Sequence, residues 1–364
     1  MSFREFLGNG TVVRRLREAI ATGRLPPALI LAGPRGAGKY TLAVRLAQAV
    51  NCLDPKQSDG LPDYCGICSN CVHIEEAVNL DTLLDQAVAA REELREVDKK
   101  ETRILIRTHP DVLVIPPDPP QLLIKLGQVR TLIREIYRMP AEARRAFYIF
   151  TSAAFMKEAA NSLLKVLEEP PSHASIVLLA ENLGDLLPTI RSRSCIFRLG
   201  VIPLEKIEKL LAERRSELRP AQRGLVARLA QGAVGQALGF NLDAYLASRT
   251  DALLILRNGL RDPEYSALFR MTETYRAGAE GQQKTADLLG ATLSLLEDFL
   301  LLKSGAAQLI RNIDIEKELA AMAQQVSLDW IEAAERGANE VRSGMRRNLL
   351  RSLSLDAFAT GLVR

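Results

Sequence analysis

The chain has 364 residues, of which 47% are hydrophobic and 25% charged. These values are typical of globular domains and exclude global disorder, and the length predicts two or three domains. The 48 basic and 44 acidic residues give a net charge of +4, which is too balanced to indicate a nucleic-acid binder by charge alone. No apolar run reaches membrane-spanning length and the first ten residues lack an apolar signal core, so we expect a cytoplasmic protein with no membrane partner.

A series of predicted strands and helices begins with the apolar run at residues 27–33. This run ends in glycine and predicts a buried strand that leads into a glycine-rich loop, and helical spacing of apolar residues follows from Lys39. Further strands are predicted at residues 110–117, 145–150 and 174–182. Helical segments lie between them, and strands that alternate with helices indicate an α/β domain with a mainly parallel sheet.

Strand patterns stop near residue 200, and helical patterns continue to the end of the chain. We therefore expect an α/β domain over residues 1–200, a small helical domain over 201–246 and an all-α domain over 247–364. Within the first domain, clustered cysteines mark a module at 51–73, and an acidic helical insertion occupies 75–105.

The acidic insertion carries a stripe of apolar residues on a helical pattern. The stripe is formed by Leu80, Leu84, Ala87, Leu94 and Val97. It predicts an amphipathic helix or a helical hairpin. The insertion is then either a solvated helix that lies on the domain or an arm that binds a partner.

The stretch "GPRGAGKYT", residues 33–41, is close to a Walker A phosphate-binding loop. Gly33, Gly38 and Lys39 match that pattern, but Tyr40 stands where the magnesium-binding Ser or Thr is required, and Thr41 comes one residue late. Backbone amides of such a loop hold phosphates, and its lysine reaches them. The position between strand and helix indicates a P-loop fold, whereas Tyr40 argues against metal-dependent hydrolysis.

Hydrolysis also needs an acidic residue at the end of a neighbouring strand, to hold the metal and orient water. The predicted strand at 145–150 is followed instead by Thr151 and Ser152. Neither side chain carries the charge to coordinate Mg²⁺ or to act as a base. Two separate parts of an ATPase site are therefore missing.

Four cysteines have the spacing C-x12-C-x2-C-x2-C: Cys52, Cys65, Cys68 and Cys71. Four thiolates can close a tetrahedral structural zinc site, and His73 is then a bystander. An iron–sulfur site is the rival, but its usual fourth cysteine followed by proline is absent here. Zinc is the favoured interpretation, and an iron–sulfur site or unmetallated thiols are the alternatives.

The stretch "LLPTIRSRSCIF", residues 186–197, places Arg191 and Arg193 after the last predicted strand. They are either two solvated arginines or include an arginine finger, a guanidinium offered to the γ-phosphate of a neighbouring subunit. Cys195 stands apart from the other cysteines, and we expect it to be a buried small apolar residue.

These motifs together resemble the delta-prime subunit family of the bacterial DNA polymerase III clamp loader, whose members are AAA+ proteins. The resemblance follows the whole chain in order. "THPDVLVI" at residues 108–115 resembles the family's His-Pro-Asp motif, and "NSLLKVLEEPP" at 161–171 is the most specific match. "LLPTIRSRS" resembles the family's Ser-Arg-Cys motif, with Ser194 in the place of the usual cysteine.

The resemblance implies an AAA+ α/β domain with a four-cysteine zinc insertion, a helical lid at 201–246 and an all-α collar at 247–364. It implies that Arg193, preceded by Ser192, is a trans-acting arginine finger. It further implies a degenerate nucleotide site, formed by Gly33, Gly36, Gly38, Lys39 and Thr41. Structural Zn²⁺ is the implied cofactor, Mg²⁺ is not expected in cis, and ATP or ADP binding without hydrolysis stays open.

The implied role is that of a subunit without ATPase activity in a hetero-pentamer with tau/gamma and delta subunits. This assembly loads the sliding clamp onto primed DNA during replication, and its DNA contacts are mainly to the phosphate backbone. Thr151 and Ser152 depart from the Asp-Glu pair of the tau/gamma ATPases, and Gly235 and Gln236 stand where the lid usually carries an arginine. The alternatives are an ATP-hydrolysing tau/gamma-like subunit and a stand-alone zinc-containing DNA-binding protein.

Overall fold

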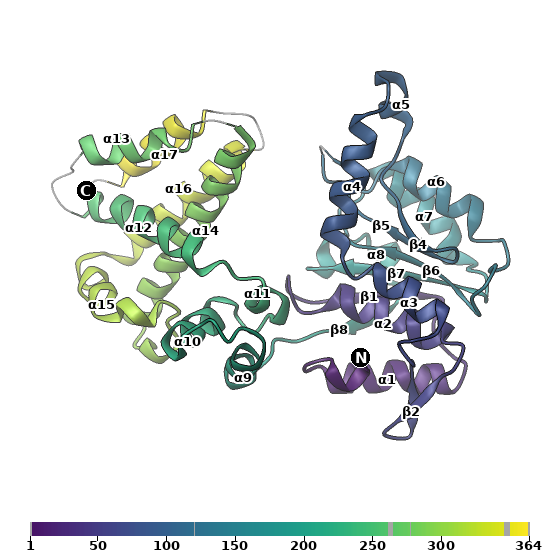
Figure 1. Cartoon of the computed structure of the whole chain (residues 1–364). Helices are drawn as coiled ribbons and strands as arrows, with labels where there is room; N and C mark the ends of the chain where they lie inside the picture. The colour runs from purple at the N-terminus through teal and green to yellow at the C-terminus, as the bar shows by residue number, and fades with distance from the viewer. Residues whose placement is uncertain (1, 120, 261–264, 277, 346–349, 363–364) are drawn as a thin grey trace. The chain divides into compact units, whose positions relative to one another are not determined.

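The computed structural model describes residues 2–119, 121–260, 265–276, 278–345 and 350–362 (Figure 1). The chain divides into two compact units. The first unit comprises Met1–Pro203 together with Ala233–Gln236, and the second comprises Leu204–Gly232 and Ala237–Arg364. The finer division into a lid and a collar remains a prediction.

The first unit is built on a six-stranded sheet in the order β4-β5-β6-β7-β1-β8. Only β4 is antiparallel to its neighbour, and all other pairs are parallel. The strands are β1 (Ala28–Ala32), β4 (Ile106–His109), β5 (Val112–Ile115), β6 (Ala146–Phe150), β7 (Ala174–Ala180) and β8 (Cys195–Arg198). The predicted α/β class with a mainly parallel sheet is therefore confirmed.

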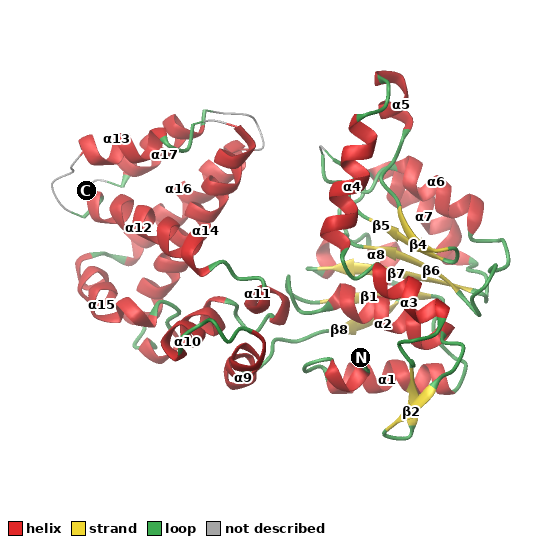
Figure 2. Ribbon diagram, viewed as in Figure 1, coloured by secondary structure: helices red, strands yellow, loops and turns green. Residues whose placement is uncertain are grey.

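Helices cover both faces of this sheet, so the strands are apolar on both sides (Figure 2). Leu29 and Leu31 of β1 face one layer, while Ile30 faces the other, because successive side chains of a strand alternate. The first layer contains α1 (Gly10–Ala21) and α2 (Lys39–Asn51). The second contains α6 (Leu126–Glu135) and α7 (Lys157–Glu168). The short helix α8 (Pro188–Arg191) precedes β8, and one-turn 3-10 helices occupy η1 (Phe3–Glu5) and η2 (Leu183–Asp185).

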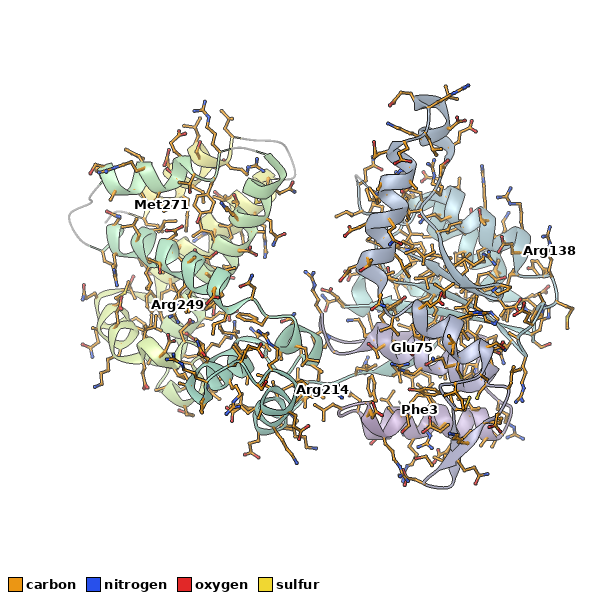
Figure 3. All side chains as sticks on the ribbon, in the orientation of Figure 1. Phe3, Glu75, Arg138, Arg214, Arg249 and Met271 are labelled. Carbon is orange, nitrogen blue, oxygen red and sulfur yellow. The ribbon has the colours of Figure 1, made fainter. Side chains whose placement is uncertain are left out.

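The segment between α2 and β4 forms a small inserted module that packs against the first layer. It consists of a hairpin, β2 (Lys56–Ser58) and β3 (Leu61–Asp63), followed by α3 (Ser69–Glu76), α4 (Leu80–Glu92) and α5 (Glu96–Glu101). Arg45 and Gln48 of α2 both donate hydrogen bonds to the carboxylate of Glu75, which joins α3 to the domain (Figure 3).

The predicted acidic insertion contains two helices, α4 and α5, and only part of its apolar stripe is buried. Leu80 and Leu84 pack against the core of the unit, and Ala87 is half-buried. Leu94 and Val97 are exposed, Val97 at 71%. The buried part of the stripe therefore ends where α4 ends.

All regular elements that the structure describes in the second unit are helical, as predicted. Its α-helices are α9 (Leu204–Arg214), α10 (Pro220–Leu229), α12 (Leu242–Asn258), α13 (Tyr265–Glu273), α14 (Gly278–Lys303), α15 (Glu316–Gln325), α16 (Leu328–Met345) and α17 (Arg351–Gly361). The short helix α11 (Val234–Leu238) begins in the first unit and ends in the second. Single 3-10 turns occupy η3 (Ala307–Leu309) and η4 (Ile313–Ile315). None of the helices within the described ranges is long and apolar enough to cross a membrane.

The sequence missed the shortest strands and the environment of one cysteine. β8 is an edge strand that pairs only with β1, and Cys195 at its start is exposed, so the prediction of a buried Cys195 was wrong. The β2–β3 hairpin did carry a signal, because Asp59 and Gly60 both have positive φ at its two-residue turn, and Asp-Gly favours that turn.

Candidate functional site

The glycine-rich loop joins β1 to α2 at the carboxyl edge of the parallel strands. Gly36 has a φ of +77° and Gly38, the N-cap of α2, a φ of +84°, which other residues rarely adopt. A Cβ at Gly36 would lie 2.8 Å from the backbone nitrogen of Gln236. The neighbouring Gly235 donates its amide to the Gly36 carbonyl at 2.8 Å. The side chain of Gln236 also donates to the carbonyl of Arg35 at 3.2 Å. Gly235 and Gln236, which stand at the position of the expected lid arginine, therefore contact the loop.

Lys39 is folded back onto the loop that it ends. Its Nζ donates to the carbonyl oxygens of Gly33 at 2.5 Å and Pro34 at 2.8 Å. Burial lowers the pKa of Lys39, and the carboxylate of Glu181 opposes this shift. Glu181 directly follows β7, the neighbour of β1, so it is an acid at the same edge of the sheet. The sequence analysis did not single it out, although the first polar residue after a buried strand is a usual place for a site residue.

The side chain of Tyr40 reaches toward the inserted module. Its hydroxyl donates to the carbonyl oxygen of Ala77, the C-cap of α3, at 2.5 Å. Burial, with a smaller contribution from Asp81, raises the pKa of Tyr40, so the hydroxyl stays a protonated donor. Thr41 lies half-buried in the first turn of α2.

The carboxyl end of β6 carries two hydroxyl residues. Thr151 donates its amide to the carbonyl of Ile115, and the Oγ of Ser152 accepts from the amide of Ala154 at 3.0 Å. Both are engaged in the turn that leaves the strand, and neither supplies a charge. β7 lies between this strand and β1.

Arg193 lies at the opposite edge of the sheet. It precedes β8, whose first residue Cys195 is level with Leu29 near the start of β1, whereas Gly33 follows the end of β1. At 3.3 Å per residue, about 13 Å of strand separates the level of Cys195 from that of Gly33, which already exceeds the reach of an arginine side chain, and Arg193 lies before Cys195. The structure therefore does not bring Arg193 and Lys39 of one chain together.

A carboxylate from the most specific sequence motif holds Arg193. Its Nη2 lies 3.0 Å from Oε1 of Glu168 at the end of α7, and its Nη1 donates to the carbonyl of Thr189 at 3.1 Å. Ser192 donates to the same carbonyl at 3.1 Å. The Arg193 side chain is 36% exposed, so this pair fixes its direction more than it stabilises the fold.

The four predicted cysteines form one cluster. The sulfur atoms of Cys52, Cys65, Cys68 and Cys71 all lie within 4.8 Å of one another, and Cys65 and Cys71 are 4.0 Å apart. A tetrahedral zinc ion with Zn–S bonds of about 2.3 Å requires sulfurs roughly 3.8 Å apart, so this donor set fits the ion. His73 is exposed and is not among the clustered ligand atoms.

Backbone amides around the cluster favour the thiolate form that a metal needs. The amides of Cys68 and Ile67 donate to the sulfur of Cys65 at 3.3 and 3.5 Å, and the amide of Cys65 donates to Cys52 at 3.2 Å. Burial raises the pKa of Cys65, but these amides and the neighbouring thiols outweigh it and lower that pKa to about 6. Burial raises the pKa of Cys52.

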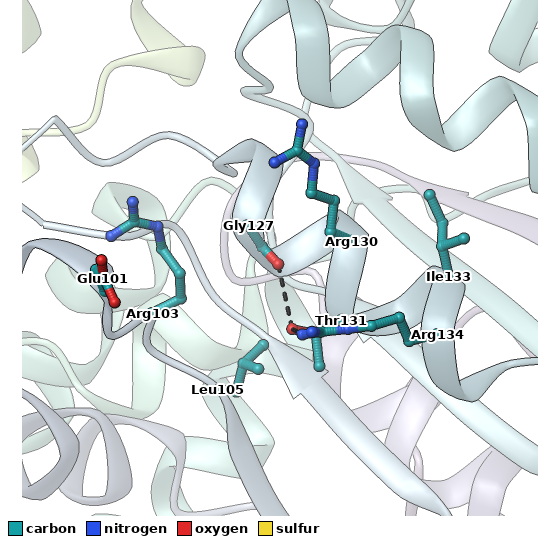
Figure 4. Close-up of a pocket in the computed structure, with 8 residues that line it drawn as sticks. All are labelled: Glu101, Arg103, Leu105, Gly127, Arg130, Thr131, Ile133 and Arg134. Atoms are coloured by element: carbon teal, nitrogen blue, oxygen red, sulfur yellow. Dashed lines mark hydrogen bonds between the residues drawn. The ribbon is translucent and has the colours of Figure 1, made fainter.

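A second polar feature of this unit is a pocket of 460 Å³ beside α6 (Figure 4). Arg103, Arg130 and Arg134 line it, with Thr131 accepting a hydrogen bond from Arg134 at 3.1 Å. Gly127 lets the side chain of Arg103 lie across the helix, because a Cβ there would meet it at 3.0 Å. Glu101 also lines the pocket, so three guanidinium groups outnumber one carboxylate, and this excess of positive charge suits a phosphate-bearing ligand.

The five parallel strands, the glycine loop between β1 and α2, and the helices on both faces define the class as an AAA+ P-loop protein. The family model described as "DNA polymerase III, delta subunit" matches residues 8–203. The chain therefore belongs to this family of clamp-loader proteins, as the sequence analysis expected.

Curated relatives agree with this family. The chain is 30% identical over 210 residues to the DNA polymerase III subunit gamma of Buchnera aphidicola from Acyrthosiphon pisum, covering 57% of this chain and 48% of that protein. It is 28% identical over 252 residues to the subunit tau of Escherichia coli K12, covering 68% and 33%. The chain thus spans about half or less of the length of these relatives.

Solved structures give a weaker likeness. A DNA polymerase III gamma subunit-related protein from Thermotoga maritima superposes with a TM-score of 0.42 at 17% identity, covering 95% of this chain and 98% of that one. The RuvB Holliday junction branch migration motor of the same organism gives a TM-score of 0.38 at 14% identity, covering 88% of each chain. The fold class stated above rests on the sheet order of this chain itself.

Proposed function

We propose that the chain is a clamp-loader subunit of the delta-prime type, which does not hydrolyse ATP and offers Arg193 to the nucleotide of a neighbouring subunit. The observation that carries the proposal is the pair Thr151 and Ser152 at the carboxyl end of β6, where a hydrolytic site needs an acid. Tyr40 supports it, because its hydroxyl is bonded to Ala77 rather than free for a magnesium ion.

The position of Arg193 supports action in trans. Its backbone lies at the sheet edge away from its own glycine loop, so its guanidinium can reach only a nucleotide on another chain. Glu168 and Thr189 hold the side chain in a defined direction. A guanidinium is suited to this task because its planar fork of donors matches phosphate oxygens.

The role of Arg193 can be tested in a clamp loader that is reconstituted from this chain and its ATPase subunits. Arg193→Ala should leave assembly intact and lower ATP turnover by orders of magnitude at the site it faces, because an arginine finger contributes about 10³-fold or more. Arg193→Lys should fail as well, since an ammonium lacks the fork. The exposed Arg198→Ala is the matched control. Unchanged turnover with Arg193→Ala would refute the assignment.

An ATP-hydrolysing subunit of the tau/gamma type is the second candidate. The names of the curated relatives favour it, and so does Glu181, an acid close enough to Lys39 to affect its pKa. The two candidates differ in what the isolated chain does. We expect no ATP turnover and no strengthening of nucleotide binding by Mg²⁺. Turnover that disappears in Lys39→Ala and in Glu181→Gln would establish the second candidate instead.

Zinc and DNA complete the proposal. The four clustered cysteines would hold one structural Zn²⁺ that fixes α3 against α2.

The pocket of Arg103, Arg130 and Arg134 would bind backbone phosphates of primed DNA, in an assembly with tau/gamma and delta subunits and the sliding clamp. Arg130→Glu with Arg134→Glu should then weaken DNA binding by the reconstituted loader and reduce its salt dependence.

A further inference from the structure

A groove of 430 Å³ opens at the amino edge of the sheet, away from the glycine loop. It lies where α1 and α2 end, against the β2–β3 hairpin and the residues that precede β6 and β7. We call it the amino-edge groove. No site residue discussed above lines it.

The walls of the amino-edge groove are aliphatic. Ile20 of α1, Val50 of α2, and Pro55 and Pro62 of the hairpin module contribute apolar surface, and no aromatic side chain lines the groove. Aliphatic walls bind aliphatic side chains, whereas sites for single-stranded nucleic acid use aromatic rings on which bases stack.

The rim of the groove is basic. Lys56, Arg144 and Arg145 line it, and no Asp or Glu does. Within the described ranges, no carboxylate forms an ion pair with any of the three. A cluster of cations without acids attracts a partner of opposite charge.

The helix ends nearby do not need these cations. The last carbonyls of α1 accept from the chain's own backbone, since Arg24 donates its amide to Ala19 and Gly23 to Ile20. The carbonyl of Asn51 at the end of α2 accepts from the side chain of Asn70 at 3.0 Å. The positive charge of the rim is therefore not used to cap either helix.

Arg145 is half-buried, and its guanidinium is bonded to a neutral carbonyl rather than to a carboxylate. Its Nε and Nη2 donate to the neutral carbonyl of Ala174 at 3.1 and 2.9 Å, and burial lowers its pKa. The fully buried Asn51 bonds both the amide and the carbonyl of Arg145 at 3.0 Å, which fixes its backbone. A half-buried guanidinium that meets only a neutral acceptor is costly until an anion joins it.

From this charge and lining we infer that the amino-edge groove is a docking site for a short acidic and apolar peptide segment of a partner protein. Carboxylates of the segment would meet Lys56, Arg144 and Arg145, and its aliphatic side chains would fill the groove between α1, α2 and the hairpin. This site is independent of the nucleotide edge and of Arg193, so it stands whether or not the proposed function holds.

The test uses the full chain and a library of random dodecapeptides displayed on phage. Recovered peptides should combine Asp or Glu with aliphatic residues. Their binding, measured by fluorescence anisotropy, should weaken by about tenfold or more in Lys56→Glu/Arg144→Glu, because reversal of two rim charges turns attraction into repulsion. Both residues are exposed, so the variant should fold, and the exposed Arg138→Glu is the matched control that should bind normally. Replacing the aliphatic residues of a recovered peptide with alanine should also weaken its binding to the chain.

Three outcomes would overturn the inference. The first is that every recovered peptide binds the double variant as tightly as the wild-type chain, or that no peptide is recovered. Another is oligothymidylate that binds the wild-type chain and loses that binding in the double variant, since the groove would then serve nucleic acid. The third is self-association of the wild-type chain that the double variant abolishes, since the occupant would then be a second copy.

Discussion

At the scale of single residues, Tyr40 stands where the Walker A pattern has the Ser or Thr whose hydroxyl holds Mg²⁺. The Tyr40 hydroxyl donates instead to the carbonyl of Ala77. The loop can therefore keep its glycine conformations and Lys39 while its helix is tied to the inserted module. The substitution links the nucleotide edge to the cysteine cluster through α3.

The His-Pro-Asp motif has a structural explanation at the same scale. The Nδ1 of His109 accepts from the amide of Asp111 at 3.1 Å, which shapes the turn between β4 and β5. The Asp111 carboxylate accepts from the amides of Ala141, Glu142 and Ala143 at 2.7 to 2.8 Å. The motif thus anchors the loop that leads into β6.

Asp111→Asn should lower the free energy of unfolding by about 1–3 kcal/mol, because an amide cannot accept all three hydrogen bonds and presents donors to donors. Urea denaturation at neutral pH measures this, and the exposed Asp85→Asn is the control, expected within about 0.5 kcal/mol of wild type. Equal stability of the two variants would contradict the anchoring role.

The Asp111 carboxylate also predicts how the stability of the protein depends on pH. Burial raises the pKa of Asp111, but the three amides and His109 outweigh it, so the folded pKa lies below its usual value. The carboxylate then contributes stability fully above about pH 4, and this contribution is lost as pH falls through the folded pKa. The difference between wild type and Asp111→Asn should stay constant from about pH 7 to 5 and shrink below about pH 4.

At the scale of elements, the cysteine cluster organises the module between α2 and β4. Cys52 follows α2 directly and Cys71 lies in α3, so one ion would join the two helices. Gln48 of α2 donates to the carbonyl of Cys71 at 2.8 Å and adds to this connection. The hairpin between them is too short to fold alone, so the module depends on these links.

We expect the purified chain to carry about one zinc ion, and Cys71→Ser to lose it and to unfold several degrees lower, because a closed structural site contributes folding energy. Elemental analysis and thermal denaturation measure the two effects. Cys195→Ser, at an exposed cysteine, should retain both metal and stability, as should His73→Ala. Iron in place of zinc in the wild-type chain would contradict the assignment.

The insertion is anchored at the element scale by a buried ion pair. Arg91 near the end of α4 pairs with Asp118, which is fully buried, and Lys125 lies 3.3 Å from the same carboxylate. Beyond this anchor the chain continues into α5 with Leu94 and Val97 in solvent. α4 therefore lies on the domain, whereas Leu94 and Val97 beyond it are exposed. The partner-binding interpretation stays a prediction.

At the scale of the whole molecule, the two units have separate cores. Phe147, Phe150 and Leu29 belong to cores of the first unit, while Phe299 and Trp330 belong to the core of the second. A buried polar network also holds the second unit together. Asp298 accepts from the amides of Arg311 and Asn312 at 2.8 and 3.0 Å, and Arg249 joins Asn312 to Asp314 (Figure 3).

Asp298→Ala should lower the stability of the second unit by about 2–4 kcal/mol, because it leaves buried donors without their acceptor. Two separate cores predict two transitions in calorimetry, of which only one should shift. Metal content should not change. The exposed Glu335→Ala is the control and should leave both transitions in place. A shift of both transitions with Asp298→Ala would show that the units unfold together.

Much of the first unit could be predicted because its strands are long, apolar runs bounded by glycine or polar residues, as at Ala28–Ala32 and Ala174–Ala180. The four-residue strand at Cys195–Arg198 was not predicted, since it is an exposed edge that carries a charge and shows no alternation. The amino-edge groove was not predicted either, because its residues come from five separate segments of the chain.

The sequence by itself determined the α/β class, the clamp-loader family and the grouping of four cysteines, because spacing along the chain encodes periodicity, loop motifs and close neighbours. Only the tertiary structure decided that Glu181 lies at the same sheet edge as the glycine loop, that Tyr40 bonds Ala77, and that Arg193 lies at the far edge from its own loop. These relations depend on which strands are neighbours and at which edge each one ends. Strand order is set by the packing of the whole sheet, which local sequence patterns do not contain.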